Sequence, residues 1–302
     1  KKKRTAFAQS DTGKQIMTAM IDAVRRKEAS GMVERFSHHS FLTLRLCGNI
    51  CCGCVIRDEY SQETVELPGD AVIVATGGMH GLFGNTTGSL SNTGEVTAEL
   101  FRLGVPLANG EMIQYHPTTV KCGGKRMLIS EAARGEGGRL FAMKDGKQWY
   151  FMEEKYPELG NLMPRDITAR EIWKVSHESE VFLDMTEISE EIISNKLSGL
   201  ADDCMTYLHK DIRKEPVSVL PGIHYFMGGI LVDEQHRTPI QNLYAAGECC
   251  AQYHGANRLG GNSLLGALYG GRVAAKSACE QADVVDLSCA TQIDFPPASQ
   301  IS

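Results

Sequence analysis

The chain has 302 residues and a formal net charge of −6, from 31 Lys and Arg against 37 Asp and Glu. Because an acidic chain repels phosphates on average, nucleic acids and anionic membrane surfaces are not expected as partners. Hydrophobic residues make up 42% and charged residues 23%, which excludes a disordered chain. No apolar run approaches the roughly 18 residues that a membrane helix needs, so no membrane span is predicted.

The ten cysteines predict neither a disulfide framework nor a metal centre. A chain of this length does not need covalent staples, and two of the cysteine pairs are adjacent in sequence. We therefore expect reduced cysteines and a cytoplasmic protein. The four cysteines within residues 47–54 fit no iron–sulfur or zinc spacing, and no metal site is predicted.

The first elements in chain order are a helix and a small antiparallel insert. Asp11 is expected to cap a helix whose apolar residues recur at helical spacing over residues 16–24, with Gly31 ending it. Short strand-like runs follow at residues 41–47, 54–57 and 64–67. Turns are expected at Gly48-Asn49 and at Gly53.

Two apolar strands end in glycine-containing loops. Residues 70–75 (DAVIVA) predict a fully buried parallel strand followed by Thr76-Gly77-Gly78. Residues 243–246 predict a second strand, which leads into Gly247-Glu248. Such strand ends let the backbone approach a ligand closely. The Glu248 carboxylate is suited to bind ribose or ribityl hydroxyls, although a solvated loop acid fits the same pattern.

The sequence pattern in the middle of the chain differs from the pattern on either side of it. An amphipathic helix is predicted at residues 93–103. From about residue 109 to residue 222, loops rich in Gly, Lys and Pro alternate with helical stretches at 165–177 and 189–210, which indicates an inserted second domain. A small-residue helix is predicted at residues 262–281, and the pattern fades after residue 282. The start of that helix could stabilise a phosphate or an electron-rich ring oxygen, or be an ordinary capped helix.

Five polar clusters carry the chemical signal. Taken singly, each fits a loop histidine, a surface ion pair, a helix cap or a turn. Together they offer His and Arg side chains in glycine-rich loops, which suits a small dicarboxylate because Arg binds carboxylates with two hydrogen bonds and His adds a directional donor. The clusters are QYHPT (114–118), SEAARGEGG (130–138), PRD (164–166), HYFMGG (224–229) and HGANRLGG (254–261).

These clusters, in this order, closely resemble the flavoprotein subunit of fumarate reductase and succinate dehydrogenase. The resemblance covers most of the chain, from about residue 4 to residue 278. It implies an α/β fold, in which a Rossmann-like FAD-binding domain is interrupted by an α+β capping domain that is mobile. The expected boundaries are residues 1–109 and 223–283 for the two parts of the FAD-binding domain, 110–222 for the capping domain and 284–302 for a tail.

The resemblance also implies the substrate site and its chemistry. His116, Ser130 and Glu131 would hold one substrate carboxylate, and His224 with Arg258 would hold the other. Hydride would pass between flavin N5 and one alkene carbon.

Arg165 would deliver the proton to the other alkene carbon, with Glu131 and Arg134 relaying protons from solvent. Guanidinium groups are weak acids in water, and surrounding positive charge with a carboxylate relay makes this role workable.

For the cofactor, the resemblance implies FAD, with Glu248 near the adenosine ribose and the helix at residue 262 near the isoalloxazine ring. It also implies an iron–sulfur partner subunit. The protein would be cytoplasmic, or peripheral at the inner face of the membrane through its partner subunits. The expected cofactor-binding residues are Ala75, Thr76, Gly77, Gly78, Glu95, Gly247, Glu248, Asn262, Ser263 and Leu264.

The chain departs from the family pattern in four places. It has no G-x-G-x-x-G loop for the FAD pyrophosphate and no C-terminal helical domain, so we expect that it begins after that loop and binds FAD poorly alone. Ser130 replaces a usual Thr, and Glu95 replaces a usual Asp. A catalytically silent fragment of such an enzyme therefore also fits the sequence.

Two further activities fit the motifs, those of L-aspartate oxidase and of a related enoate reductase. In L-aspartate oxidase a Cys typically stands in the place of Met227, and a Glu in the place of Gly266. Both differences favour the interconversion of fumarate and succinate. The direction of the reaction is not readable from these residues, since the flavin potential decides it.

Overall fold

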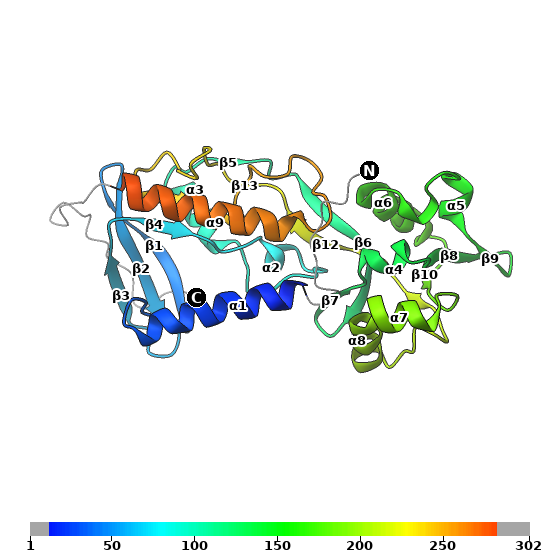
Figure 1. Ribbon diagram of the computed structural model, residues 1–302. Coiled ribbons are helices and arrows are strands. Elements are labelled where there is room, and N and C mark those ends of the chain that lie inside the picture. Colours follow the sequence, from blue (N-terminus) through cyan, green and yellow to red (C-terminus); the bar gives the residue numbers. More distant parts are fainter. Residues whose placement is uncertain (1–11, 283–302) are drawn as a thin grey trace. The chain divides into compact units, whose positions relative to one another are not determined.

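The computed structural model describes residues 12–282, which form two compact units. Unit 1 contains residues 12–24, 80–91 and 114–225, and unit 2 contains residues 25–79, 92–113 and 226–282. Figure 1 labels most of the helices and strands of both. Within residues 12–282, no helix has the length and apolar character that crossing a membrane requires. Each unit is therefore assembled from segments that are distant in sequence.

The first helix, α1 (Thr12–Ala29), confirms the predicted helix. Gly31 ends it in the left-handed conformation, while its predicted cap, Asp11, lies outside the described residues. None of its residues is buried, and its apolar side chains, such as Met17 and Met20, are about half exposed. The helical spacing of these residues therefore marks a face that the described part of the chain leaves uncovered.

In unit 2, β1 (His39–Cys47), β2 (Ile50–Asp58) and β3 (Thr64–Pro68) form the predicted antiparallel sheet. The turn at Gly48-Asn49 is confirmed, but the turn expected at Gly53 is wrong. Gly53 lies inside β2 opposite Pro68, where a Cβ atom would come 2.1 Å from the carbonyl oxygen of Leu67. Glycine is needed here because β3 approaches too closely for a side chain.

Unit 2 also contains the predicted parallel pair, β4 (Val72–Val74) and β14 (Leu243–Ala245). Val74 and Leu243 belong to a core with Leu44, Leu100 and Ile230. The expectation that the first of these strands is fully buried is wrong, because the Ile73 side chain is 40% exposed. Only one face of this strand is covered by the described residues. A second short pair joins β5 (Leu107–Ala108) to β13 (Gly229–Ile230) antiparallel.

The helices of unit 2 follow the predictions closely. Helix α3 (Glu95–Arg102) and helix α9 (Asn262–Gln281) occupy the expected segments. The buried residues of α9 are all small: Gly266, Gly270, Ala274 and Ser277. Helix α9 contacts β14 and also η2 (Gly247–Cys249). The small residues let α9 pack closely on the loop that follows β14.

Unit 1 contains two sheets that the sequence analysis did not predict. One has the order β12–β6–β7, from β12 (Leu220–Phe226), β6 (Ile113–Cys122) and β7 (Lys125–Leu128). The other has the order β11–β10–β8–β9. Its strands are β8 (Arg139–Lys144), β9 (Lys147–Trp149), β10 (Val181–Asp184) and β11 (Val217–Ser218).

The helices of unit 1 cover a core that includes Leu140, Ile172 and Leu183. Helix α6 (Arg165–Val175) confirms one prediction. The helical stretch expected at residues 189–210 is confirmed, but as two helices: α7 (Glu190–Lys196) and α8 (Ser198–Leu208) are separated at Leu197, whose φ of −122° is not helical and whose side chain is buried. The shorter elements are α2 (His80–Phe83), α4 (Glu131–Gly135), α5 (Phe151–Lys155) and η1 (Gly160–Leu162).

The cysteines mostly match the expectation of free thiols. Eight cysteines within the described residues are free, whereas Cys47 is disulfide-bonded. The expectation that all cysteines are reduced is therefore wrong at Cys47. Burial raises the pKa of the Cys51 thiol to about 11, so this side chain acts as a small apolar residue of the core.

Candidate active site

Helix α4 places the acidic side chain of Glu131 and the basic side chain of Arg134 in one cluster of unit 1. The Ser130 hydroxyl caps the helix by accepting a hydrogen bond from the Ala132 amide at 3.2 Å. Glu131 is the first helical residue, and Arg134 lies one turn later. The two side chains approach to 3.5 Å, between Arg134 Nη2 and Glu131 Oε1. The spacing of three residues on a helix produces this pairing.

Arg165 joins the cluster from the start of α6. Its Nε atom donates to Glu131 Oε1 at 2.7 Å, and its Nη1 atom donates to Gln114 Oε1 at 2.9 Å. The Arg165 side chain is 11% exposed, against 36% for Glu131. Pro164 directly before it sets the entry of the chain into the helix. Two partners from different elements therefore fix the direction of the guanidinium.

Arg134 is the most deeply buried cation of the cluster, with a side chain 3% exposed. Its Nη1 atom donates to the Asn161 carbonyl at 2.6 Å. Burial lowers the pKa of the Arg134 guanidinium, the Glu131 carboxylate opposes that shift, and Arg165 adds to it. Its buried Nε atom has no hydrogen-bond partner among the described residues. A buried donor without a hydrogen-bond partner is uncommon in proteins.

Two histidines face each other on neighbouring strands. His116 on β6 and His224 on β12 have ring centroids 5.3 Å apart in an edge-to-face arrangement. His116 is fully buried, and its Nε2 atom has no partner within the described part of the chain. Burial lowers the pKa of His116 well below its ordinary value, and nearby cations, Arg165 first among them, lower it further. His116 is therefore neutral at neutral pH.

The buried His116 makes stability depend on pH. Above its unfolded pKa of about 6.5, the ring is neutral in both states. As the pH falls below about 6.5, only the unfolded state takes up the proton, so folding loses about 1.4 kcal/mol per pH unit until the lowered folded pKa is reached. We expect this slope to become shallower in His116→Gln and to be unchanged in His177→Gln, an exposed control; His254, whose pKa burial also lowers, keeps part of the slope in both variants. Urea unfolding at stepped pH measures it, and parallel pH profiles for His116→Gln and the unsubstituted protein would contradict it.

The residues expected to bind FAD lie in unit 2. Ala75 and Thr76, directly after β4, are exposed, and Gly77 and Gly78 follow them. The Glu248 carboxylate, at the end of the partner strand, accepts a hydrogen bond from the Phe226 amide at 3.0 Å. The carboxyl ends of parallel strands meet at one edge of a sheet, so β4 and β14 bring these residues together.

The start of α9 also lies in unit 2. Gly261 precedes the helix and provides no side-chain cap for the amides of Asn262, Ser263 and Leu264. Uncapped amides at a helix start fit an electron-rich group. Glu95 begins α3 after Gly94, and Arg258 is buried, with Nη1 donating to the Leu259 carbonyl at 3.1 Å. These residues belong to unit 2, whereas the histidines and the Glu131 cluster belong to unit 1.

Two residues of the cluster were missed by the sequence analysis. Gln114 is buried on β6, and its side chain holds Arg165. Its signal was available, because Gln114 and His116 are two residues apart and side chains alternate along a strand. No sequence pattern indicated Asn161, because it contacts Arg134 with its backbone carbonyl in η1 and not with its side chain.

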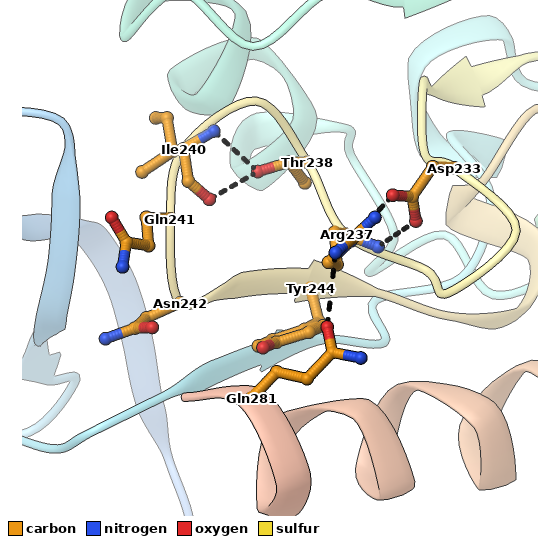
Figure 2. Close-up of a pocket in the computed structure, with 8 residues that line it drawn as sticks. All are labelled: Asp233, Arg237, Thr238, Ile240, Gln241, Asn242, Tyr244 and Gln281. Carbon is orange, nitrogen blue, oxygen red and sulfur yellow. Dashed lines mark hydrogen bonds and ion pairs between the residues drawn. The ribbon is translucent and has the colours of Figure 1, made fainter. Parts of the chain in front are cut away.

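A separate pocket of about 470 Å³ lies at the amino end of β14 and contains none of the predicted site residues. Figure 2 shows Arg237 bonded to Asp233 on one side and to Gln281 on the other. Its charged groups thus pair with one another. Among residues 12–282 there is also no group of three or more His, Cys, Asp or Glu that could hold a metal ion. The cluster around Glu131 in unit 1 and the expected FAD-binding residues in unit 2 are therefore stronger candidates for a functional site than this pocket.

Comparison with known proteins identifies the family. Residues 1–264 match the FAD binding domain family. The chain belongs to this family. FAD is therefore the cofactor of its family, and the predicted α/β fold class is confirmed by the structural match below.

Two relatives and one solved structure show which proteins the chain is similar to. The chain is 42% identical to the succinate dehydrogenase flavoprotein subunit of Bacillus subtilis, over 94% of this chain and 50% of that protein. It is 34% identical to the L-aspartate oxidase of Clostridium perfringens, over 88% of this chain and 58% of that protein. An E. coli quinol fumarate reductase structure (FrdA, mutant) superposes with a TM-score of 0.85 at 30% identity, over 95% of this chain and 52% of that chain. The chain thus spans about half the length of these relatives.

The residues of unit 2 fit a flavin nucleotide, and Gly78 tests that fit. A Cβ atom at Gly78 would lie 2.6 Å from Glu248 Oε1 and 2.7 Å from Phe226 Cδ2. Gly78→Ala is therefore expected to displace the Glu248 carboxylate and to lower the affinity for FAD at least about tenfold, a loss of about 1.4 kcal/mol. Gly271→Ala is the control, because that position on α9 has open space. Flavin absorbance after desalting measures retention, and equal retention by both variants would contradict the assignment.

Proposed function

We propose that the protein is an FAD-dependent oxidoreductase that interconverts fumarate and succinate. The observation that carries the proposal is the Arg165 guanidinium, which Glu131 and Gln114 hold in a site with two facing histidines. Relatives that are named as flavoprotein subunits of succinate dehydrogenase support it. A cationic cluster of this kind suits a substrate with two carboxylates.

In this proposal, the dicarboxylate is held at both ends. His116, Ser130 and Glu131 bind one carboxylate, with the neutral His116 ring offering a hydrogen bond. His224 and Arg258 bind the other. Glu131 alone would repel an anion, but the charges of Arg134 and Arg165 offset its carboxylate.

Arg165 carries the proton transfer. Its guanidinium gives a proton to one alkene carbon when fumarate is reduced, and Glu131 Oε1, 2.7 Å from Arg165 Nε, returns a proton to it. Arg134 supplies Glu131 in turn, because their side chains approach to 3.5 Å. When bound, FAD supplies or accepts the hydride at the other carbon.

The cofactor, domain and partner assignments complete the proposal. Ala75 to Gly78, Glu95, Gly247 and Glu248 hold FAD, with the start of α9 at its ring. Residues 110–222 form the capping domain, and residues 1–109 with 223–283 form the FAD-binding domain. An iron–sulfur subunit exchanges electrons with the flavin, and the protein is cytoplasmic or peripheral to the membrane through that partner.

L-aspartate oxidase is the second candidate, supported by the 34% identical relative. Met227 and Gly266 favour the interconversion of fumarate and succinate over it, as argued from the sequence. The discriminating experiment assays the purified, flavin-loaded protein with succinate and with L-aspartate, using an artificial electron acceptor. We expect turnover with succinate and none with L-aspartate, and the reverse preference would overturn the proposal.

A further inference from the structure

Tyr253 and His236 hold the short segment of unit 2 that follows β14. The Gly247 amide donates to the Tyr253 hydroxyl at 3.1 Å. His236 Nδ1 lies 2.7 Å from the Ala245 carbonyl, and Nδ1 is the donor because a carbonyl oxygen can only accept. The two rings are neighbours, with centroids 5.5 Å apart. One pair of side chains therefore holds the backbone of this segment at two positions.

Gly247 is the residue of this segment whose backbone is least restricted by its own chemistry. Its φ of 78° lies in the left-handed region, and glycine has no Cβ atom to exclude other conformations. The residues on either side have anchors of their own. The Ala246 amide donates to the last carbonyl of β4 at 2.8 Å, and the Glu248 carboxylate accepts from the Phe226 amide at 3.0 Å. Between these anchors, the hydrogen bond to Tyr253 fixes the Gly247 amide.

Two glycines of α9 leave the space that the Tyr253 side chain fills. At Gly270, a Cβ atom would overlap the Tyr253 hydroxyl and would come 2.9 Å from His236 Cε1. At Gly266, about one turn earlier, a Cβ atom would lie 3.6 Å from Tyr253 Cγ. The hydroxyl therefore reaches the Gly247 amide only because α9 carries no side chain at Gly270.

We propose that Tyr253 is a positioning residue for FAD, which holds Gly247, and with it Glu248, in the arrangement that the cofactor binds. Without the hydroxyl, the Gly247 amide loses its protein partner and the segment populates other backbone conformations. The affinity for FAD then falls in proportion to the fraction of molecules that keep the binding arrangement. The inference rests on the proposed placement of FAD at Gly247 and Glu248, whereas the hold on the Gly247 amide is independent of that placement.

The first test needs no flavin. Tyr253→Phe keeps the ring and removes only the hydroxyl, and we expect the Gly247 amide of the purified full chain to exchange with deuterium about tenfold faster, the effect of one lost hydrogen bond. The Ala246 amide, which bonds to β4, should keep its exchange rate. Tyr269→Phe makes the same chemical change at an exposed tyrosine of α9 and is the control variant. Exchange followed by NMR resolves the single amides.

The second test measures the affinity for FAD. Titration of the full chain with FAD, followed by flavin fluorescence, gives the Kd, and we expect a rise of about tenfold in Tyr253→Phe and no change in Tyr269→Phe. Gly270→Ala should raise the Kd as well, because its Cβ atom displaces the Tyr253 hydroxyl. Gly271→Ala should not, because that position has open space. Two different substitutions that break the same hydrogen bond are thus expected to act alike.

The outcomes separate the inference from the proposed function. An unchanged Gly247 exchange rate in Tyr253→Phe would overturn the hold on the amide, and faster exchange with an unchanged Kd would overturn the role toward FAD. An equal rise in Kd for Tyr269→Phe would reduce the effect to loosened packing and overturn that role too. FAD binding without dicarboxylate turnover in the unsubstituted protein would overturn the proposed reaction and leave the inference standing. No FAD binding at all would overturn the placement of the cofactor and, with it, the role of Tyr253 toward FAD.

Discussion

Replacing Arg165 with Lys or Gln is expected to lower kcat for fumarate reduction by about 10²- to 10⁴-fold, the range of a lost general acid, with little change in KM. Lys keeps the charge but cannot bond Glu131 and Gln114 together, as the guanidinium does at 2.7 and 2.9 Å. Steady-state kinetics with fumarate and an artificial donor measures both parameters.

A matched control separates chemistry from folding. Arg139 also binds a carboxylate through two bonds, to Glu153 at 2.9 and 2.8 Å, and reaches the cluster only indirectly, through the hydrogen bond from Asn161 to Glu153 at 3.0 Å. Arg139→Lys is therefore expected to keep kcat while losing some stability. Unchanged turnover in both Arg165 variants would remove Arg165 from the acid role, and equal losses in Arg139→Lys would point to folding instead.

Glu131→Gln is expected to produce the second large effect, a fall in kcat of about 10²-fold. Gln has nearly the same shape and still accepts a hydrogen bond from Arg165, so the guanidinium stays in place. The variant lacks the carboxylate that returns the proton to Arg165 and that offsets the positive charges of Arg134 and Arg165. A solvent deuterium isotope effect on kcat, larger in the variant, would identify the slowed step as proton transfer.

Glu136→Gln is the control for this prediction. Glu136 pairs with Lys196 at 2.8 Å at the surface, an ion pair of little energetic weight. The control should leave kcat and its isotope effect unchanged. A Glu131→Gln variant that turns over as fast as Glu136→Gln would exclude Glu131 from the relay.

The sequence predicted those parts of the fold whose signal is local. The strands of the parallel pair and α9 were predictable because an apolar run with a following glycine and a small-residue helix each fix one element. The strands in residues 139–184 were missed because they do not alternate: Leu140, Phe141 and Ala142 in β8 are all buried. The break at Leu197 depends on burial of that side chain, which the helical periodicity does not report.

The candidate site was only partly predictable, for a related reason. The motifs named Glu131, Arg134, Arg165 and the two histidines, and unit 1 brings these together; their roles stay predictions. The 2.8 Å contact between Thr87 Oγ1 and His224 Nδ1 joins residues that are 137 positions apart in the sequence, so no spacing indicates it.

The most direct test of the proposed reaction is the reoxidation of reduced flavin by fumarate. The flavin-loaded protein is reduced without oxygen and mixed with fumarate, while flavin absorbance and succinate are followed. We predict rapid return of the oxidised flavin spectrum with one succinate formed per flavin. Bound flavin that stays reduced in the presence of fumarate, yet reoxidises with an artificial acceptor, would contradict this reaction.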